Sequence, residues 1–408
     1  MCLIAELIPA SGTEALRGRT HKARIIGLGH QRARGIKGGA IIDLEAAEQS
    51  IRLAIDAAER MARVEVRSVI VNMTGGRLKS EAFKAEVALR GQGVTSHDIR
   101  RVFESMSYTG GDAGRSVLHS LPTGFSIDET RHIRDPHGMI GERLGVDMHV
   151  LSSDEYAIRN LMLAVERCHV GVEAVVATPY ASGLSALVDD EAEMGVAVVD
   201  FGGGTTSVGV FSNGVLVHAD AIAVGGSHIT MDIARGLSTG INHAERLKTL
   251  YGSTLASPSD DRETVAVASV DEAQVDHVYH IAKSQLVRII RPRVEEILEL
   301  VRDRLKASGF SAEAGRRLVL TGGGASLTGL AELCRIIVLK QVRVGRPLGV
   351  QGLPDTVKGP AFAAPVGLLV YPQVAALEYF EPRTSGLVLG TGTDGYFTRV
   401  GRWLRESF

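Results

Sequence analysis

Apolar residues in the first part of the chain follow a strand–strand–helix–strand order. Short apolar runs at residues 2–7 and 23–27 predict two strands, and residues 43–62 carry apolar positions at helical spacing. Asp43 stands where that helix needs an N-cap. An apolar run at 66–73 predicts a buried strand that ends at a glycine pair.

The middle of the chain has a different pattern. Residues 78–149 are more polar, with a predicted helix at 95–107 and short β-like runs at 116–127. A helix at 152–166 and a strand at 171–177 then resume the earlier order. The polar stretch is therefore interpreted as an inserted module.

The second half repeats the first with one strand more. Apolar runs at 196–201, 207–211 and 215–222 predict three consecutive strands, with a hairpin turn at 212–214. A helix is predicted from Ile229 onward. Only two strands precede the first helix of the first half.

The remaining segments complete the repeat. Residues 258–275 are predicted to be weakly structured, and 280–307 form an amphipathic stretch that should kink or split at Pro292. A strand at 317–320 enters a glycine run, and 363–371 is apolar. Together the patterns predict an α/β protein with a duplicated core, in which ligands bind beyond the carboxyl ends of the strands.

Composition narrows the functional classes. A chain of 408 residues predicts two or more domains, and a net charge of −2 gives no large field for nucleic acid. The three cysteines are far apart, without zinc-site spacing, and are interpreted as reduced thiols. No run is long enough to span a bilayer, and the first ten residues lack a signal-peptide pattern. We expect a cytoplasmic protein.

The strongest chemical motif follows the first strand of the second half. Asp200 stands at the mouth of that strand and is predicted to bind Mg²⁺ or to orient a water. The next residues are predicted to hold phosphates, through close backbone amides and two hydroxyl groups: Gly202, Gly203, Gly204, Thr205 and Thr206. A glycine hairpin without a ligand is the alternative.

Two further elements extend this candidate site. A second glycine run ends the strand at 317–320 and is predicted to pack against a nucleoside through Gly322, Gly323, Gly324 and Ala325. Glu245 and Lys248 lie three apart on a predicted helix and are expected to contact ribose and adenine, unless they form an exposed salt bridge. Gly226 is a further candidate contact for phosphate or sugar.

These loops carry a resemblance to a known family. Residues 200–205 resemble the second phosphate loop of the actin, heat-shock chaperone and sugar kinase superfamily, and 318–325 resemble its adenosine motif. Residues 363–368 resemble its second connecting helix. Residues 226–234, with Ala244-Glu245-Arg246-Leu247-Lys248, look like the FtsA family of bacterial cell-division proteins. The resemblance covers essentially the whole chain.

The resemblance implies an actin-like two-lobed ATPase fold with a duplicated ribonuclease H-like core. The implied parts are a first-lobe core (1–77, 150–180 and 362–380), an inserted α+β subdomain (78–149), a second-lobe core (181–231 and 311–361), a second-lobe subdomain (232–310), a linker (381–395) and an amphipathic helix (396–408). ATP and Mg²⁺ would bind between the lobes, mainly as a conformational and polymerisation switch with slow turnover.

One feature departs from the family pattern. Family members begin with a strand and a glycine loop that binds phosphate, whereas residues 1–7 resemble the strand that follows this loop. The missing third strand of the first half agrees with that comparison. We therefore expect the first phosphate loop to be absent from the sequence given, with weaker nucleotide binding as the consequence.

The C-terminal segment has the pattern of an interfacial membrane helix. Its apolar face carries Phe397, Val400, Trp403, Leu404 and Phe408, and it is flanked by Arg399, Arg402 and Arg405. The arginines would meet anionic lipid. A helix docked on the body is the alternative, although the preceding Gly/Thr/Ser-rich linker favours a tether.

The resemblance also implies partners. Lys283, Arg288 and Arg293 lie where the family binds the C-terminal peptide of FtsZ, although such basic residues also occur on solvated faces. Self-assembly into filaments, recruitment of later division proteins and a peripheral position on the inner membrane at the septum are implied as well. A small-molecule kinase and a pilus-assembly scaffold of the same superfamily remain alternatives.

Overall fold

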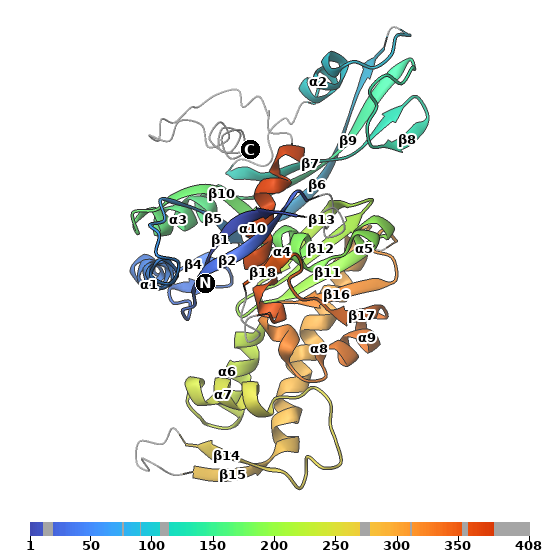
Figure 1. Ribbon diagram of the computed structural model, residues 1–408. Coiled ribbons are helices and arrows are strands. Elements are labelled where there is room, and N and C mark those ends of the chain that lie inside the picture. Colours follow the sequence, from blue (N-terminus) through green and yellow to red (C-terminus); the bar gives the residue numbers. More distant parts are fainter. Residues whose placement is uncertain are drawn as a thin grey trace.

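The computed structural model describes residues 1–10, 19–75, 77–89, 91–106, 114–269, 278–310, 312–352 and 358–378. Within them, the molecule has two lobes on either side of a pair of central helices, with one extension from each lobe (Figure 1). The predicted linker and terminal helix, residues 381–408, lie outside the described residues. No helix in the described parts is both long and apolar enough to cross a membrane.

The second lobe is built on one continuous sheet with the strand order β13-β12-β11-β16-β17. Its strands are β11 (Val196–Phe201), β12 (Thr206–Ser212), β13 (Val215–Ile222), β16 (Arg317–Thr321) and β17 (Gln341–Val344). The antiparallel triple β11 to β13 confirms the three predicted strands, and β16 and β17 add parallel pairings. Asn213 and Gly214 form the predicted turn with positive φ angles.

The first-lobe strands form two separate sheets. One contains β1 (Cys2–Pro9), β2 (His21–Gly29) and β18 (Val350–Gln351), and the other pairs β5 (Ser68–Met73) with β10 (Gly171–Ala177). Among the described residues, no strand is hydrogen-bonded to both sheets. Helices α1 (Leu44–Ala62) and α3 (Glu155–Glu166) belong to this lobe, and Asp43 caps α1 as predicted.

Two apolar helices cross at the centre of the molecule. In α4 (Thr178–Ala186) every residue is buried, and α10 (Ala363–Val370) packs directly against it. A Cβ on Gly367 would lie 1.8 Å from the carbonyl oxygen of Ala181, so this crossing requires glycine. The apolar segment at 363–371 was predicted, but α4 was not.

The inserted module is a four-stranded antiparallel sheet with one helix. The elements are β6 (Lys79–Ala88), α2 (Ser96–Glu104), β7 (Arg115–Ile127), β8 (Thr130–Ile133) and β9 (Arg143–Asp154), with the strand order β6-β9-β7-β8. Thr95 and Asp98 form a capping box that begins α2. The predicted short runs at 116–127 are one long strand, and residues 152–154 end β9 rather than begin a helix.

The second lobe carries its own extension, at the bottom of Figure 1. It contains α6 (Gly226–Gly236), α7 (Ile241–Tyr251), β14 (Thr264–Ala268), β15 (Val278–Ala282) and α8 (Lys283–Ala307), and α9 (Leu330–Val338) follows β16. The weakly structured segment predicted at 258–275 was wrong in part, because β14 pairs with β15. Helix α8 does not split at Pro292, since buried apolar residues on both sides keep its face on the core.

A buried contact between a histidine and a carboxylate holds Glu378 in the body of the protein. The Nδ1 atom of His119 lies 3.1 Å from the carboxylate of Glu378, and both side chains are fully buried. The Nε2 atom accepts a hydrogen bond from the amide of Ala177, the residue before α4, at 2.9 Å. Tyr180 and Tyr371 pack edge-on against the imidazole ring. His119 therefore links Glu378 to the residue that precedes α4.

Candidate functional site

Asp200 is placed at the carboxyl end of β11, in the centre of the second-lobe sheet. Its neighbours across the sheet are Ser207 on β12 and Thr321 on β16. The carboxylate accepts a hydrogen bond from the hydroxyl of Ser182, on α4, at 2.5 Å. Burial raises the pKa of Asp200 to about 6, although the bond from Ser182 acts in the opposite direction. The carboxyl group of Asp200 can therefore gain or lose its proton close to neutral pH.

The glycine loop after Asp200 folds back on itself. The amide of Gly202 donates to the carbonyl of Thr205 at 2.9 Å. The carbonyls of Gly202 and Gly203 accept from the amides of Gly226 and Ser227, at the first turn of α6. The amides of Gly203 and Gly204 donate to no described residue, and Gly203 is exposed. Three of the loop carbonyls, those of Gly202, Gly203 and Thr205, are therefore bonded within the protein, whereas these two amides have no acceptor among the described residues.

The hydroxyl of Thr206, predicted as a phosphate donor, is fully buried. It donates to the carbonyl of Val224 at 2.8 Å and supports the loop from below. Gly225 packs against the same loop, since a Cβ there would lie 2.6 Å from the carbonyl oxygen of Gly202. Thr205, in contrast, is partly exposed.

The second glycine run lies directly beside the first. Gly322 has a φ of +84°, and a Cβ there would lie 2.5 Å from Oδ1 of Asp200. A Cβ on Gly324 would lie 2.1 Å from the ring of Phe201. Residues Gly323–Ser326 form a 3-10 turn in which Ala325 is buried. The structure therefore brings both predicted glycine loops together around β11, as a shared ligand requires.

Glu245 and Lys248 form an ion pair at 2.8 Å on α7. Lys248 also donates to the carbonyl of Gly226 at 3.0 Å and contacts the hydroxyl of Thr230, which bonds to Glu245. Burial opposes ionisation of Glu245, but the hydrogen bonds from Lys248 and Thr230 outweigh it and lower the pKa of Glu245. The salt bridge between these residues is therefore present within α7, and their bonds to Gly226 and Thr230 tie α7 to the first turns of α6.

The opposite wall comes from glycine turns that sequence reasoning missed. Between the two-residue strands β3 (Ile36–Lys37) and β4 (Ala40–Ile41), Gly38 and Gly39 have positive φ angles. A Cβ on Gly39 would lie 2.6 Å from the amide of Gly75, and one on Gly204 would lie 3.6 Å from the amide of Gly38. The Gly38-Gly39 pair between two predicted elements was the available signal.

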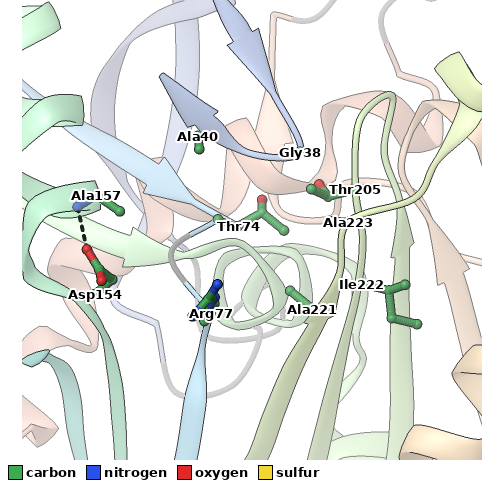
Figure 2. A pocket seen from close by; sticks show the side chains of 11 residues that line it. Gly38, Ala40, Thr74, Arg77, Asp154, Ala157, Thr205, Ala221, Ile222 and Ala223 are labelled. Carbon is green, nitrogen blue, oxygen red and sulfur yellow. Dashed lines mark hydrogen bonds between the residues drawn. The ribbon is translucent and has the colours of Figure 1, made fainter. Parts of the chain in front are cut away.

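A cavity of about 450 Å³ opens where these turns face Thr205, and we call it the interlobe cavity. Its first-lobe wall carries Thr74, Gly75 and Arg77, while its second-lobe wall runs along residues 221–223 (Figure 2). Asp154 also lines it, and its carboxylate accepts the amide of Ala157 as the cap of α3. Of the predicted phosphate-binding residues, Thr205 is the one that reaches this cavity.

These residues fit a phosphate-bearing ligand with a divalent cation. The free amides of Gly203 and Gly204 lie in a loop whose exposed glycine leaves room for phosphate oxygens. Among the described residues no cluster of three His, Cys, Asp or Glu side chains is present, so Asp200 is a single carboxylate. A cation held mainly by phosphates and waters, with one protein carboxylate, is the arrangement that Mg²⁺ prefers.

The predicted basic surface on α8 is largely paired within the chain. Lys283 lies 2.8 Å from Glu263, and Arg293 lies 2.6 Å from Asp232 on α6. Arg288 is exposed and has no ion pair among the described residues. Of the three predicted contacts, Arg288 is the one most available to a partner. The predicted membrane residues, 397–408, lie outside the described residues.

Comparisons with known proteins agree with this arrangement. Residues 197–367 match the family described as cell division protein FtsA, and residues 75–152 match the SHS2 domain inserted in FTSA. The cell division protein FtsA of Rhizobium meliloti is 51% identical over 408 residues, covering 100% of this chain and 92% of the relative. Its counterpart in Escherichia coli K12 is 32% identical over 391 residues, covering 94% and 92%.

A solved structure shows the same fold at low sequence identity. The PilM-PilN type IV pilus biogenesis complex superposes with a TM-score of 0.60 at 16% identity, covering 90% of this chain and 94% of that chain. This likeness concerns the fold alone. The predicted actin-like α/β fold with an inserted domain is confirmed by the family matches and this superposition. The chain belongs to the FtsA family of cell-division proteins.

Proposed function

We propose that the protein binds Mg²⁺-ATP between its two lobes. The observation that carries the proposal is the loop after β11, where two amides that donate to no described residue follow the buried Asp200. The carbonyls of Gly202 and Gly203 are bonded to α6 and that of Thr205 is bonded within the loop, while the amides of Gly203 and Gly204 stay available as donors to an anion. The glycine turns of the first lobe face it across the interlobe cavity.

Each residue of this site has a distinct task. Gly203 and Gly204 supply amides to phosphate oxygens, and the glycines at 322–324 let the backbone approach the nucleoside. Asp200 holds the cation through water, and Ser182 keeps its carboxylate oriented. Mg²⁺, when bound, neutralises phosphate charge and positions the phosphate oxygens. Lys248 and Glu245 fix the helix ends behind the loop and stay candidates for contact with the sugar and base.

Turnover should be slow. Among the residues that line the interlobe cavity, Asp154 is the one carboxylate, and it is engaged as the cap of α3. A kinase for small molecules needs a base that is free to take a proton from its substrate. The described lining offers none, so the nucleotide acts as a conformational and assembly switch rather than as a phosphate donor.

In the cell, we propose that the protein forms actin-like filaments and attaches FtsZ filaments to the cytoplasmic face of the inner membrane at the division septum. Membership in a family of cell-division proteins supports the division role. Exposed Arg288 on α8 supports contact with the acidic peptide of FtsZ. The amphipathic pattern of residues 396–408 supports peripheral attachment to anionic lipid, and later division proteins would join the same assembly.

Two experiments test the proposal. Asp200→Ala should lower the affinity for Mg²⁺-ATP, measured by titration with a fluorescent ATP analogue, and equal affinity of both proteins would contradict the site. Co-sedimentation of FtsZ with anionic vesicles, with the full chain and with a chain that ends at residue 395, should show recruitment by the full chain alone. Recruitment without residues 396–408, or none with the full chain, would contradict the adaptor role.

A further inference from the structure

Among the described residues that line the interlobe cavity, Arg77 carries the one cationic side chain, and the others are glycine, alanine, threonine, isoleucine and Asp154 (Figure 2). It is exposed, and no ion pair joins it to any described residue. Asp154 shares the lining, but no salt bridge forms between the two. The cavity thus contains a positive charge that has no counter-ion in the part of the chain that the structure describes.

The backbone of Arg77 is held firmly in place. Its φ of +54° is the left-handed conformation that side chains other than glycine rarely adopt. Its carbonyl accepts a hydrogen bond from Nη2 of Arg115 at 2.6 Å. Arg115 in turn donates to the hydroxyl and the carbonyl of Ser152 on β9. The base of the inserted module therefore fixes where the Arg77 side chain starts.

The cavity begins where the phosphate loop ends. Gly203 and Gly204 carry the free amides, and the next residue, Thr205, lines the cavity. A polyphosphate held on these amides would therefore lie beside the cavity, close enough for one end to enter it past Thr205. Arginine recognises phosphate through several N–H donors in one plane, and such charge-assisted bonds are among the stronger ones.

We propose that the interlobe cavity receives the terminal phosphate of a nucleoside triphosphate and that Arg77 binds it. This inference rests on the proposed nucleotide site and adds a residue that distinguishes a triphosphate from a diphosphate. A diphosphate on the same loop leaves the cavity without its anion. Arg77 then links the state of the nucleotide to the base of the inserted module through Arg115.

The test compares two variants with the same chemical change. Arg77→Gly removes the guanidinium and suits the left-handed backbone, so the fold is retained. Arg63→Gly is the matched control, because Arg63 is also an exposed arginine with φ of +58°, at the end of α1 and outside the cavity lining. Affinities for a non-hydrolysable ATP analogue and for ADP are measured with Mg²⁺ by calorimetric titration. Arg77→Lys tests whether charge alone suffices.

In Arg77→Gly, affinity for the ATP analogue should fall about tenfold, as the loss of one charge-assisted hydrogen bond implies, while ADP affinity changes less than about twofold. Arg63→Gly should leave both unchanged, and Arg77→Lys should fall between. An equal loss for both nucleotides, an equal effect of Arg63→Gly, or no effect of Arg77→Gly would overturn the inference while the proposed function stands. Failure of the unmodified protein to bind either nucleotide would overturn both.

Discussion

The hydroxyl of Ser182 donates a hydrogen bond to the buried carboxylate of Asp200 at 2.5 Å. Ser182 belongs to the central helix α4, whereas Asp200 ends the middle strand of the second lobe. The bond therefore connects the helix between the lobes to the acid that precedes the glycine loop at 202–204. It is also the one contact that favours the charged form of Asp200, against the effect of burial.

Asp200 should make the stability of the ligand-free protein depend on pH. Its pKa is about 6 in the folded protein and near 3.8 in the unfolded chain, so the folded state binds this proton more tightly. The stabilisation that Asp200 gains from this tighter proton binding is complete below about pH 4 and is lost as the pH rises through about 6. The free energy of unfolding changes by about 3 kcal/mol over this range. Asp200→Asn should therefore raise the melting temperature at pH 7.5 by a few degrees.

The same variant should show a flatter dependence of melting temperature on pH between about pH 4 and pH 6, measured by differential scanning fluorimetry. Glu245→Gln is a suitable comparison, because the pKa of Glu245 is lowered rather than raised. At pH 7.5, Asp200→Asn could instead melt at the same temperature as the unmodified protein or below it. That result would contradict the destabilisation that we attribute to burial of the charged carboxylate.

Ser182→Ala should shift the pH dependence of nucleotide binding. Removal of the hydroxyl takes away the bond that lowers the pKa of Asp200, so the pKa rises further above 6. As the pH is lowered, Asp200 is then protonated earlier. The Mg²⁺-dependent affinity for ATP should therefore be lost at a higher pH than in the unmodified protein. Titrations at half-unit steps from pH 5.5 to pH 8.5 measure the midpoint. Ser185→Ala serves as the control, since Ser185 bonds to the carbonyls of Ser182 and Ala363.

Gly322→Ala should disrupt the site as well as the fold. The added Cβ would meet Oδ1 of Asp200 at 2.5 Å and the carbonyl of Phe201 at 2.6 Å, on a backbone with φ of +84°. Gly309→Ala introduces a similar strain at φ of +77° with no atom within 4 Å. The control should cost about 1 kcal/mol, and Gly322→Ala clearly more, with loss of ATP binding. If Gly322→Ala and Gly309→Ala had equal free energies of unfolding in urea, the protein would have to shift so that the added Cβ at residue 322 no longer clashes with Asp200.

Charge reversal on α8 should separate partner contacts from internal ones. Arg288→Glu should weaken binding of the FtsZ C-terminal peptide about three- to tenfold, the range for loss and reversal of an exposed ion pair. Arg293→Glu should weaken it too, but it also breaks the bond to Asp232 and should lower the melting temperature. Arg302→Glu, farther along the helix, is the control. Fluorescence anisotropy with unchanged affinity for Arg288→Glu would place the interface elsewhere.

Removal of residues 396–408 should release the protein from anionic vesicles and leave the body folded. Within this segment, Arg405→Ala should reduce vesicle affinity about fivefold, since one basic residue contributes about 1 kcal/mol. Trp403→Glu should reduce it at least about tenfold, because a charge replaces a large apolar group. High salt should weaken binding in part. A Trp403 emission spectrum that does not shift on addition of lipid would argue against this helix as the anchor.

Periodicity and turn residues predicted the duplicated core because each element satisfies a local rule. The run at 171–177 is β10 to the residue, and Asp43 caps α1 as its position implied. Helix α4 escaped prediction because burial of every residue removes the polar face on which helical periodicity depends. Strand β14 escaped because its pairing partner, β15, lies beyond a segment with no strand signal.

In the candidate site, too, local sequence motifs were predictable and long-range contacts were not. The glycine run after Asp200 was recognisable from its three consecutive glycines at a strand end. The structure places it beside the second run at Gly322. The roles of Ser182 and Arg77 were not predictable, since each depends on a long-range approach between separate elements. Arg293 looked like a free contact in sequence, yet its ion pair with Asp232 on α6 spans 61 positions.

The buried pair of His119 and Glu378 determines how the body responds to mechanical load at its C-terminal end. A pull on the chain beyond Glu378 is shared between the backbone that leads back to α10 and the imidazole of His119, which contacts the amide of Ala177. That amide begins α4, the helix whose Ser182 holds Asp200. Tension on the proposed membrane tether would therefore reach both central helices, α4 and α10, and not only a surface loop that could absorb it.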